Sequence, residues 1–326
     1  MAGLLRRRFP RATLAWAVEP ASRPLVENYP GLDEVIVFER GQAWRSAWRF
    51  LREIRSRHFD LVLDLQRHLK SGIVSRMSGA PVRFGFHRTD AKEFNWLFNN
   101  RFIPAAGNGI PKILHYMEFA KALGIEPEIE WDLNLTPQEI LAVTERLRGI
   151  NGDFAALFAG ARWQSKGWFP EQIAACAEEL ERRYQLATVL LGSHDDREVA
   201  TEAVARSRER IYNWVGETSL REAAGIISRA RVCVGPDTGL MHLAASVGTP
   251  VVSLWGATDP LRTGPYGFGD LVIQGNAECS PCYRAECRIG RICMRSIGTN
   301  AILAKVESAL SRAKHGRDID DTLRPV

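Results

Sequence analysis

The sequence predicts an α/β protein of two doubly wound, Rossmann-like domains that face each other across a cleft. Two observations lead to this fold class. Short apolar runs alternate with segments of helical periodicity, which is the pattern of βα units and a parallel sheet. The pattern restarts after Asn151-Gly152-Asp153, and 326 residues suffice for two domains with separate cores. We expect an N-terminal domain over 1–150, a second domain over 151–300, and a C-terminal helix with a polar tail over 301–326.

In the first half, short apolar runs indicate strands, and apolar residues recurring every three or four positions indicate helices. The predicted strands are Ala12–Val18, Glu34–Phe38 and Leu61–Leu65. The predicted helices are Gln42–Arg57, Lys70–Ser78, Pro111–Leu123 and Pro137–Arg148. The first of these helices carries Arg45, Arg49, Arg52 and Arg55 outside its apolar stripe. A basic amphipathic helix of this kind can lie on a membrane surface, but packing of the stripe on the sheet is the simpler interpretation.

The second half repeats the alternation more regularly. Its predicted strands are Ala155–Phe158, Ala187–Leu191, Val232–Val234 and Val251–Leu254. Its predicted helices are Pro170–Tyr184, Asp195–Ser207, Ser219–Ser228 and one from Gly239 to about Val247. In doubly wound sheets ligands bind beyond the carboxyl ends of the strands, so we expect the binding loops there.

Positive charge is concentrated near the N-terminus. Residues 1–101 contain 18 Lys and Arg against 10 Asp and Glu, whereas residues 151–326 contain 21 of each kind. Such an excess attracts an anionic partner such as nucleic acid, an anionic lipid or an acidic sugar, although it also fits a solvated basic face. Arg6-Arg7-Arg8 is followed by Phe9-Pro10-Arg11 and not by a long apolar segment. We therefore expect neither a signal peptide nor an anchor, and a cytoplasmic location.

The segment 231–256 holds the strongest binding signal. An apolar strand stops at Gly235-Pro236, and Asp237-Thr238-Gly239 then opens a helix. The free amides of a helix start, together with the helix dipole, favour phosphate oxygens. His242, in the first turn, can donate to the same anion. Taken alone this is also the pattern of any capped βα turn.

Two further loops are expected at the same sheet edge. Residues 160–170 follow the first strand of the second half, and offer Arg162 and Lys166 as phosphate donors and Trp163 or Trp168 as a cover for a base or sugar. Two anion-binding loops at one edge favour a nucleotide diphosphate over coincidence. After the next strand, a carboxylate of Asp195-Asp196 can either bind ribose hydroxyls or merely cap the following helix.

These residues resemble the glycosyltransferase family 9 lipopolysaccharide heptosyltransferases. Gly235 to Ala244 resembles the donor-site motif of that family, and Gly160–Pro170 its lysine loop. The N-terminal half adds Asp64-Leu65-Gln66, Lys70-Ser71, Gly85-Phe86, Asp90-Ala91-Lys92-Glu93 and the segment from His115 to Glu118. The resemblance implies the GT-B fold, an ADP-heptose donor and an anionic inner-core lipopolysaccharide acceptor at the cytoplasmic membrane face.

Roles for individual residues follow from the resemblance alone. Lys166, Thr238 and Gly239 would hold the diphosphate, Asp237 and His242 would frame the site, and Asp196 would contact the ribose. The acceptor would be bound by Gln66, Arg67, Lys70, Arg88 and Lys92. The implied reaction inverts the anomeric carbon by direct displacement and requires no cofactor. The implied partners are a nucleotide-sugar donor and an anionic glycolipid, with peripheral contact to the inner membrane surface and no nucleic acid.

The family pattern also predicts an element that the sequence does not display. Family members begin with a strand and a Gly-Asp turn that carries the catalytic carboxylate, whereas Gly3 to Pro10 looks like the end of the helix that follows. We therefore expect the first strand, which lies in the interior of such a sheet, to be missing. The catalytic base is then unassigned, with Asp64 at a strand end as a weak candidate.

Four of the six cysteines lie within 15 residues, as Cys279, Cys282, Cys287 and Cys293. Four thiolates can bind zinc or an iron–sulfur cluster, although only the first pair has the spacing of a zinc knuckle. Four reduced thiols in a compact loop are the alternative.

Two other functions also fit the sequence. One is a sugar-nucleotide 2-epimerase of similar fold, and the other is a nucleotide-sugar binding protein with impaired catalysis.

Overall fold

The computed structural model describes residues 1–38, 44–107, 109–131 and 133–315. These residues form two compact units, Met1–Glu130 and Trp131–Val326. The fold class is α/β with parallel sheets, as predicted. The cleft expected between the two units stays a prediction. Among the helices of the described residues, none has the length and apolar character needed to cross a bilayer.

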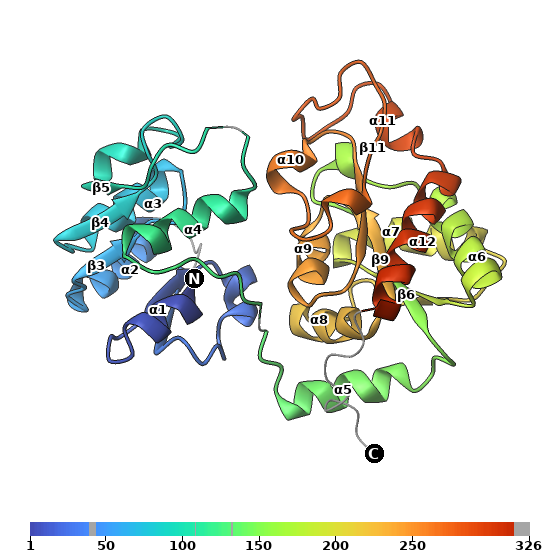
Figure 1. The fold of residues 1–326 in the computed structure, drawn as a ribbon, viewed down its shortest axis with the longest axis horizontal. Coiled ribbons are helices and arrows are strands. Elements are labelled where there is room, and N and C mark those ends of the chain that lie inside the picture. Colours follow the sequence, from blue (N-terminus) through green and yellow to red (C-terminus); the bar gives the residue numbers. More distant parts are fainter. Residues whose placement is uncertain (39–43, 108, 132, 316–326) are drawn as a thin grey trace. The chain divides into compact units, whose positions relative to one another are not determined.

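Within its described residues, the first unit contains five short parallel strands and four α-helices, and Figure 1 shows their arrangement. In chain order these are α1 Ala2–Arg8, β1 Ala15–Val18, β2 Glu34–Val37, α2 Trp44–Ser56, β3 Leu61–Leu63, α3 Leu69–Met77, β4 Val82–Gly85, β5 Arg101–Phe102 and α4 Lys112–Ala122. The predicted start of α2 at Gln42 lies outside the described residues. The apolar stripe of α2 packs on β1 and β2 through Phe50 and Ile54, which confirms the packing interpretation of that helix.

The strands of the first unit form two separate sheets, with the orders β1-β2 and β3-β4-β5. A doubly wound sheet has the order 3-2-1-4-5-6, so its first strand lies between the second and the fourth. The observed sheets correspond to strands 2 and 3 and to strands 4, 5 and 6 of that order. Among the described residues no strand joins the two sheets, and the absence of a first strand stays a prediction.

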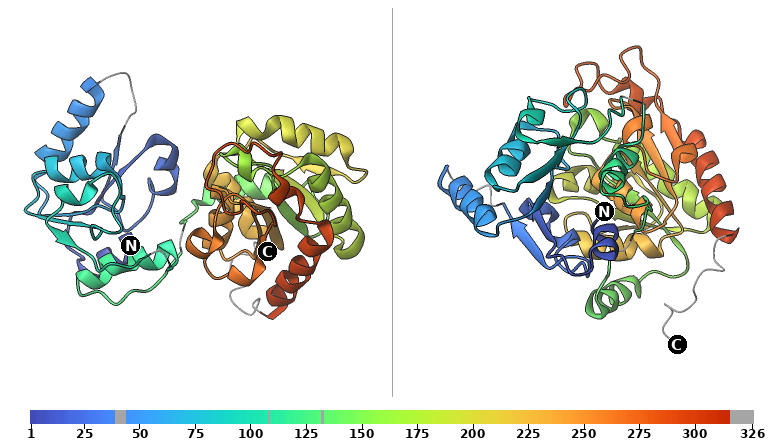
Figure 2. Two further views of the ribbon diagram at one scale, coloured as in Figure 1. Left: turned by 90° about the horizontal axis from the view of Figure 1, so that it is seen from above. Right: turned by 60° about the vertical axis from the view of Figure 1, so that its left-hand side comes forward.

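The second unit contains one continuous parallel sheet with the order β11-β10-β9-β6-β7-β8. Its strands are β6 Phe154–Phe158, β7 Ala187–Leu191, β8 Ile211–Asn213, β9 Val232–Pro236, β10 Val251–Trp255 and β11 Val272–Gln274. Its helices are α5 Pro137–Leu147, α6 Pro170–Tyr184, α7 Arg197–Arg206, α8 Leu220–Arg229, α9 Gly239–Ser246, α10 Pro260–Thr263, α11 Ile292–Arg295 and α12 Thr299–His315. Helices α6, α7 and α12 cover one face of the sheet, and α8 and α9 cover the other (Figures 1 and 2). All five residues of β6, β9 and β10 are buried, which explains their continuous apolar sequences.

The division between the units precedes α5, whereas the sequence suggested a boundary at Asn151. Helix α5 packs on α8 of the second unit, where a Cβ built on Gly225 would lie 2.7 Å from Cγ2 of Val143. Arg221 of α8 donates to Glu139 of α5 from its Nη2 atom at 2.8 Å. These contacts attach α5 to the second unit. The turn at Asn151, which the sequence suggested as the boundary, follows α5 and therefore lies within the second unit.

Candidate functional site

Four neighbouring strands of the second unit end at one edge of its sheet. Because β10, β9, β6 and β7 are parallel and adjacent, the loops that follow them lie side by side. These loops contain Thr258 after β10, Asp237 after β9, the segment 160–170 after β6, and Asp196 after β7. Segment 160–170 is the lysine loop named above. The structure thus brings together the three segments in which the sequence placed the donor site.

Lys166 of the lysine loop points at the loop that precedes α9. Its Nζ atom lies 2.5 Å from Oδ2 of Asp237, and Thr258 donates its hydroxyl to the same oxygen at 2.7 Å. The Lys166 and Asp237 side chains are only 17% and 11% exposed. The Lys166 ammonium also lies 4.5 Å from the centroid of the Trp163 ring. A cation is therefore held beside the start of α9, as the diphosphate hypothesis requires.

The start of α9 is open and has no acidic residue in its first turn. Thr238 is the N-cap residue, but its side chain makes no capping hydrogen bond. The first amides of a helix have no acceptor within the helix, so those after Thr238 can bind an anion. A Cβ built on Gly239 would meet nothing within 4 Å, which shows that this side of the helix start is not packed. His242 of α9 and Arg162 of the lysine loop are exposed.

Asp196 lies beside the lysine loop but already caps a helical turn. Its Oδ2 atom accepts hydrogen bonds from the amide and the hydroxyl of Ser193, both at 2.7 Å. A Cβ on Gly160 would lie 1.9 Å from Oδ1, so only glycine admits the carboxylate there. The capping interpretation is thus what the structure shows, and the ribose contact stays a prediction.

Only one of the two tryptophans proposed as a cover for a base or sugar remains available. Trp168 is 1% exposed and belongs to the core cluster beneath α6, so its assignment to the ligand was wrong. Its position directly before helix α6 turns the indole into the core. Trp163 is half-buried next to Lys166, and its role as a cover for a base or sugar stays a prediction.

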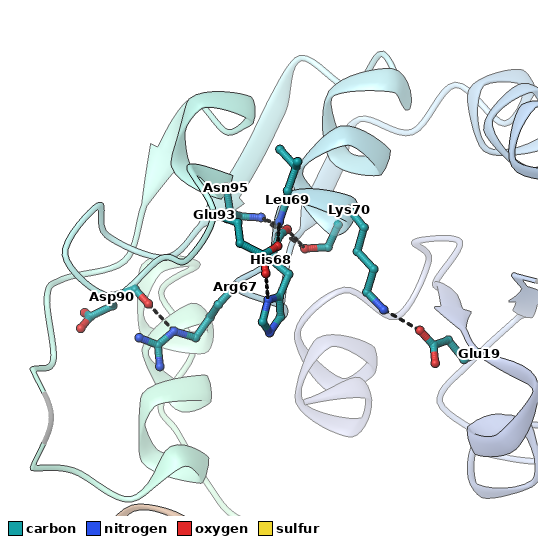
Figure 3. Close-up of polar contacts among 9 residues, drawn as sticks. Glu19, Arg67, His68, Leu69, Lys70, Asp90, Glu93 and Asn95 are labelled. Carbon is teal, nitrogen blue, oxygen red and sulfur yellow. Dashed lines mark hydrogen bonds and ion pairs between the residues drawn. The ribbon is translucent and has the colours of Figure 1, made fainter. Parts of the chain in front are cut away.

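The residues assigned to the acceptor follow two adjacent strands of the first unit. Gln66, Arg67 and Lys70 follow β3, whereas Arg88 and Lys92 follow β4. A backbone hydrogen bond from Lys92 to the Arg67 carbonyl, 2.7 Å long, joins the two loops. Lys70 forms an exposed ion pair with Glu19 at 2.7 Å, and Arg67 donates to the Asp90 carbonyl (Figure 3). The predicted acceptor residues are therefore brought to one region of the first unit.

An open depression of about 420 Å³ lies at the start of α3. It is lined by His68, Leu69, Lys70, Ile73 and Glu93. Glu93 accepts from the Leu69 amide at 3.1 Å and lies 3.0 Å from Nδ1 of His68, so it caps the helix (Figure 3). Its hydrogen bonds to His68 and to the Leu69 amide hold the pKa of Glu93 below its ordinary value. A carboxylate thus already occupies an anion position at this helix start.

Asp64, the weak candidate for the base, organises the turn after β3. It is 5% exposed, and burial raises its pKa. Its oxygens accept from the Gln66 amide at 3.1 Å, from Asn95 at 2.7 Å and from Asn99 at 3.3 Å. A carboxylate surrounded by fixed donors is suited to holding a turn and not to taking a proton from a substrate. The structure leaves the proton acceptor unassigned.

The segment 279–298, which we call the cysteine loop, lies against the lysine loop. The thiols of Cys279, Cys282, Cys287 and Cys293 are all free. Burial raises the pKa of Cys293 above its ordinary value, against a backbone hydrogen bond at Met294 that lowers it. Over the described ranges, no three His, Cys, Asp or Glu side chains are grouped so that they could hold one metal ion. The metal site therefore stays a prediction, which metal analysis of the purified protein can test.

Two contributors to the site were missed from the sequence. Thr258 follows the end of β10, so the strand-end rule that located Asp237 could have found it. The cysteine loop contacts the lysine loop across more than 100 residues of sequence, for example from Arg291 to Gly167. No local pattern signals a contact of that kind.

Comparison with known proteins gives a consistent result. Residues 47–293 match the family described as "Glycosyltransferase family 9 (heptosyltransferase)". The chain is 28% identical to lipopolysaccharide heptosyltransferase 1 of Pseudomonas aeruginosa, over 86% of this chain and 80% of that protein. It is 24% identical to the lipopolysaccharide core heptosyltransferase OpsX of Haemophilus influenzae, over 82% of this chain and 77% of that protein.

Solved structures show the same fold. ADP-heptose lipopolysaccharide heptosyltransferase II of Escherichia coli superposes with a TM-score of 0.73 at 22% identity, over 96% of this chain and 94% of that chain. A UDP-GlcNAc 2-epimerase of Methanocaldococcus jannaschii is more distant, with a TM-score of 0.54 at 13% identity and 92% of each chain covered. The likeness to the epimerase is one of fold alone.

Proposed function

The chain belongs to glycosyltransferase family 9, the heptosyltransferases, and on that premise we propose that it transfers a heptose from ADP-heptose to the inner core of lipopolysaccharide with inversion at the anomeric carbon. The observation that carries the donor assignment is the ion pair of Lys166 with Asp237 beside the open start of α9. A nucleotide diphosphate carries negative charge and is large enough to contact both the Lys166 ammonium and the amides at the start of α9. No cofactor is part of the proposal.

In the proposed reaction the donor site stabilises the departing diphosphate. Negative charge develops on the phosphate oxygens as the glycosidic bond breaks, and fixed donors aimed at that charge lower the barrier. Lys166 supplies an ammonium, and the amides after Thr238 supply donors aligned with the helix dipole. An ammonium has three hydrogens, so Lys166 can keep Asp237 as one acceptor while it donates to phosphate. Asp237, held by Thr258, therefore positions the cation.

The test of this assignment is the affinity of the purified protein for ADP, measured by calorimetry. Lys166→Ala removes the charge-assisted contact of an ammonium group whose side chain is only 17% exposed, so we expect ADP to bind roughly 10- to 100-fold more weakly. Lys305→Ala is the matched control, because this lysine lies in the same unit and donates to the Asp270 carbonyl. Equal ADP affinity in the Lys166→Ala variant and the parent would rule the diphosphate assignment out.

Product analysis separates the proposed transfer from the two alternatives. Incubation with ADP-heptose and a truncated inner-core acceptor should give an extended acceptor and ADP. An epimerase would give a changed sugar nucleotide without an acceptor, and an impaired binding protein would give no product while retaining ADP affinity. Either of these outcomes would contradict the transferase proposal.

The acceptor proposal rests on the cations at the ends of β3 and β4. The acceptor is a glycolipid, so the protein would act at the cytoplasmic face of the inner membrane through peripheral contact. Helix α2 supports such contact, because Trp48 is 56% exposed on its outer surface and Arg49, Arg52 and Arg55 are exposed there too. Indole and guanidinium groups suit the surface of an anionic bilayer.

Sedimentation with vesicles tests the membrane contact. The protein should bind phosphatidylglycerol vesicles strongly and phosphatidylcholine vesicles weakly. An Arg49→Glu/Arg52→Glu/Arg55→Glu variant should bind both kinds of vesicle equally weakly. Equal sedimentation of parent and variant with the anionic vesicles would contradict the assignment to α2.

A further inference from the structure

The cysteine loop holds the lysine loop on both sides of Lys166. The Ser165 amide donates to the Ala285 carbonyl at 3.0 Å, and its hydroxyl donates to the Arg284 carbonyl at 2.5 Å. After Lys166, Nη1 of Arg291 donates to the Gly167 carbonyl at 3.0 Å. The backbone that carries the donor-site cation is thus fixed by a segment more than 100 residues away.

Arg291 adopts a backbone conformation that ordinarily belongs to glycine. Its φ is 57°, directly after Gly290 at 70°, and its amide donates to the Cys287 sulfur at 3.1 Å. A side chain in the left-handed region is strained, whereas glycine takes the same conformation freely. A strained residue is kept only where its surroundings impose it, and such residues cluster at functional positions. The backbone alone would favour glycine here, so the arginine side chain must supply what glycine cannot.

The Arg291 side chain packs against Gly167 and Phe169 of the lysine loop. Its guanidinium carbon lies 4.1 Å from the centroid of the buried Phe169 ring, which gives a close cation–π contact at the end of the lysine loop. A Cβ on Gly167 would lie 2.8 Å from Nη1, so glycine at 167 admits the guanidinium. Partial burial and the neighbouring Arg295 lower the pKa of Arg291. The guanidinium therefore connects the cysteine loop with Gly167 and Phe169.

We propose that Arg291 is a positioning residue for the donor diphosphate, acting through Lys166. This inference rests on the proposed function, because it assumes that Lys166 contacts the phosphates. Arg291 holds the Gly167 carbonyl, which fixes the chain direction just after Lys166, while the contacts of Ser165 fix it just before. Loss of the arginine leaves Lys166 free to move relative to the start of α9, and a cation that must be re-ordered on binding contributes less affinity.

Arg291→Gly separates positioning from stability. Glycine relieves the left-handed strain, so the melting temperature should change little, whereas ADP affinity should fall roughly fivefold to tenfold with the loss of a charge-assisted contact. Arg288→Ala, an exposed arginine of the same loop, is the control and should leave both quantities unchanged. Arg291→Lys keeps the charge and the backbone strain. It lacks the planar set of N–H donors and the flat stacking surface of a guanidinium, so it should also weaken ADP binding.

A double-variant cycle decides whether Arg291 acts through Lys166. In a Lys166→Ala background, Arg291→Gly should have almost no further effect on ADP affinity, because the group it positions is already gone. Additive effects, or unchanged ADP affinity in both Arg291 variants, would overturn the positioning role while leaving the proposed function intact. If Lys166→Ala itself leaves ADP affinity unchanged, the proposed function fails first. If the melting temperature of Arg291→Gly lies far below that of the parent protein, the same cycle is measured with Arg291→Lys in its place.

Discussion

The two units present cations at the ends of parallel strands in different ways. In the second unit, Lys166 and Asp237 are largely buried at the edge of one continuous sheet, and Thr258 and the cysteine loop hold them in place. In the first unit, Lys70 pairs with Glu19 on the surface, next to sheets that are separate from each other. The residues of β3 are only half-buried. We infer that a continuous sheet fixes its binding groups in advance, whereas the first unit depends on polar networks within its turns.

The largest effect is expected where the first unit depends on such a network. Asp64→Ala removes the acceptor for the Gln66 amide, Asn95 and Asn99, and buried donors without an acceptor should destabilise this unit by roughly 3 kcal/mol. Hydrogen exchange should then accelerate in residues 61–103 and remain unchanged in β6, β9 and β10. Asp64→Asn, which keeps one acceptor oxygen, should have a smaller effect. Unaltered exchange over residues 61–103 would show that the network is not what holds this unit.

A smaller, pH-dependent effect is expected in the second unit, where Arg221 fastens α5. The hydrogen bond with Arg221 lowers the pKa of Glu139 to about 2 from an ordinary value of 4.5. A depressed carboxyl pKa contributes stability that is present above pH 4.5 and is lost as the pH falls toward 2. Because Glu139 is partly exposed, we expect the loss to be about 1–2 kcal/mol.

Urea unfolding between pH 6 and pH 2.5 measures this contribution. Glu139→Gln should be less stable than the parent protein near neutral pH, and the difference should shrink as the pH falls. Parallel stability curves for the two proteins would be inconsistent with the Arg221 contact.

The smallest stability effect is expected for the exposed cations of the first unit. Lys70→Ala breaks only a surface ion pair, so the free energy of unfolding should change by less than about 0.5 kcal/mol. The same variant should raise the KM for the acceptor, and the rise should diminish at high salt because screening weakens the lost attraction. If transfer kinetics at low salt do not distinguish Lys70→Ala from the parent, the acceptor assignment of this residue is wrong.

The sequence predicted the second unit better than the first, for a physical reason. Buried strands such as β6, β9 and β10 are continuous apolar runs, so the loops that follow them could be located and assigned to one edge. Strand β5 has two exposed residues, and β11 is largely unburied, so neither carries a pattern that predicts a strand, and both were missed. The short strands β4 and β8, each with a single buried residue, were missed as well.

The candidate site was also predicted only in part. Lys166 and Asp237 follow strand ends and were found, whereas Arg291 depends on a contact across 124 residues of sequence. The position of Trp168 in the core was misjudged because a tryptophan in a loop can turn either toward a ligand or inward. Which way it turns is decided by the packing beneath α6 and not by the neighbouring residues.

The most direct test of the donor site is a crystal structure of this protein with ADP. We expect phosphate oxygens within hydrogen-bond distance, about 2.7–3.2 Å, of both the Lys166 ammonium and the amides that open α9. Asp237 should keep its contact with Thr258. ADP bound with its diphosphate away from the start of α9, and Lys166 still paired with Asp237 alone, would show that the donor assignment is wrong.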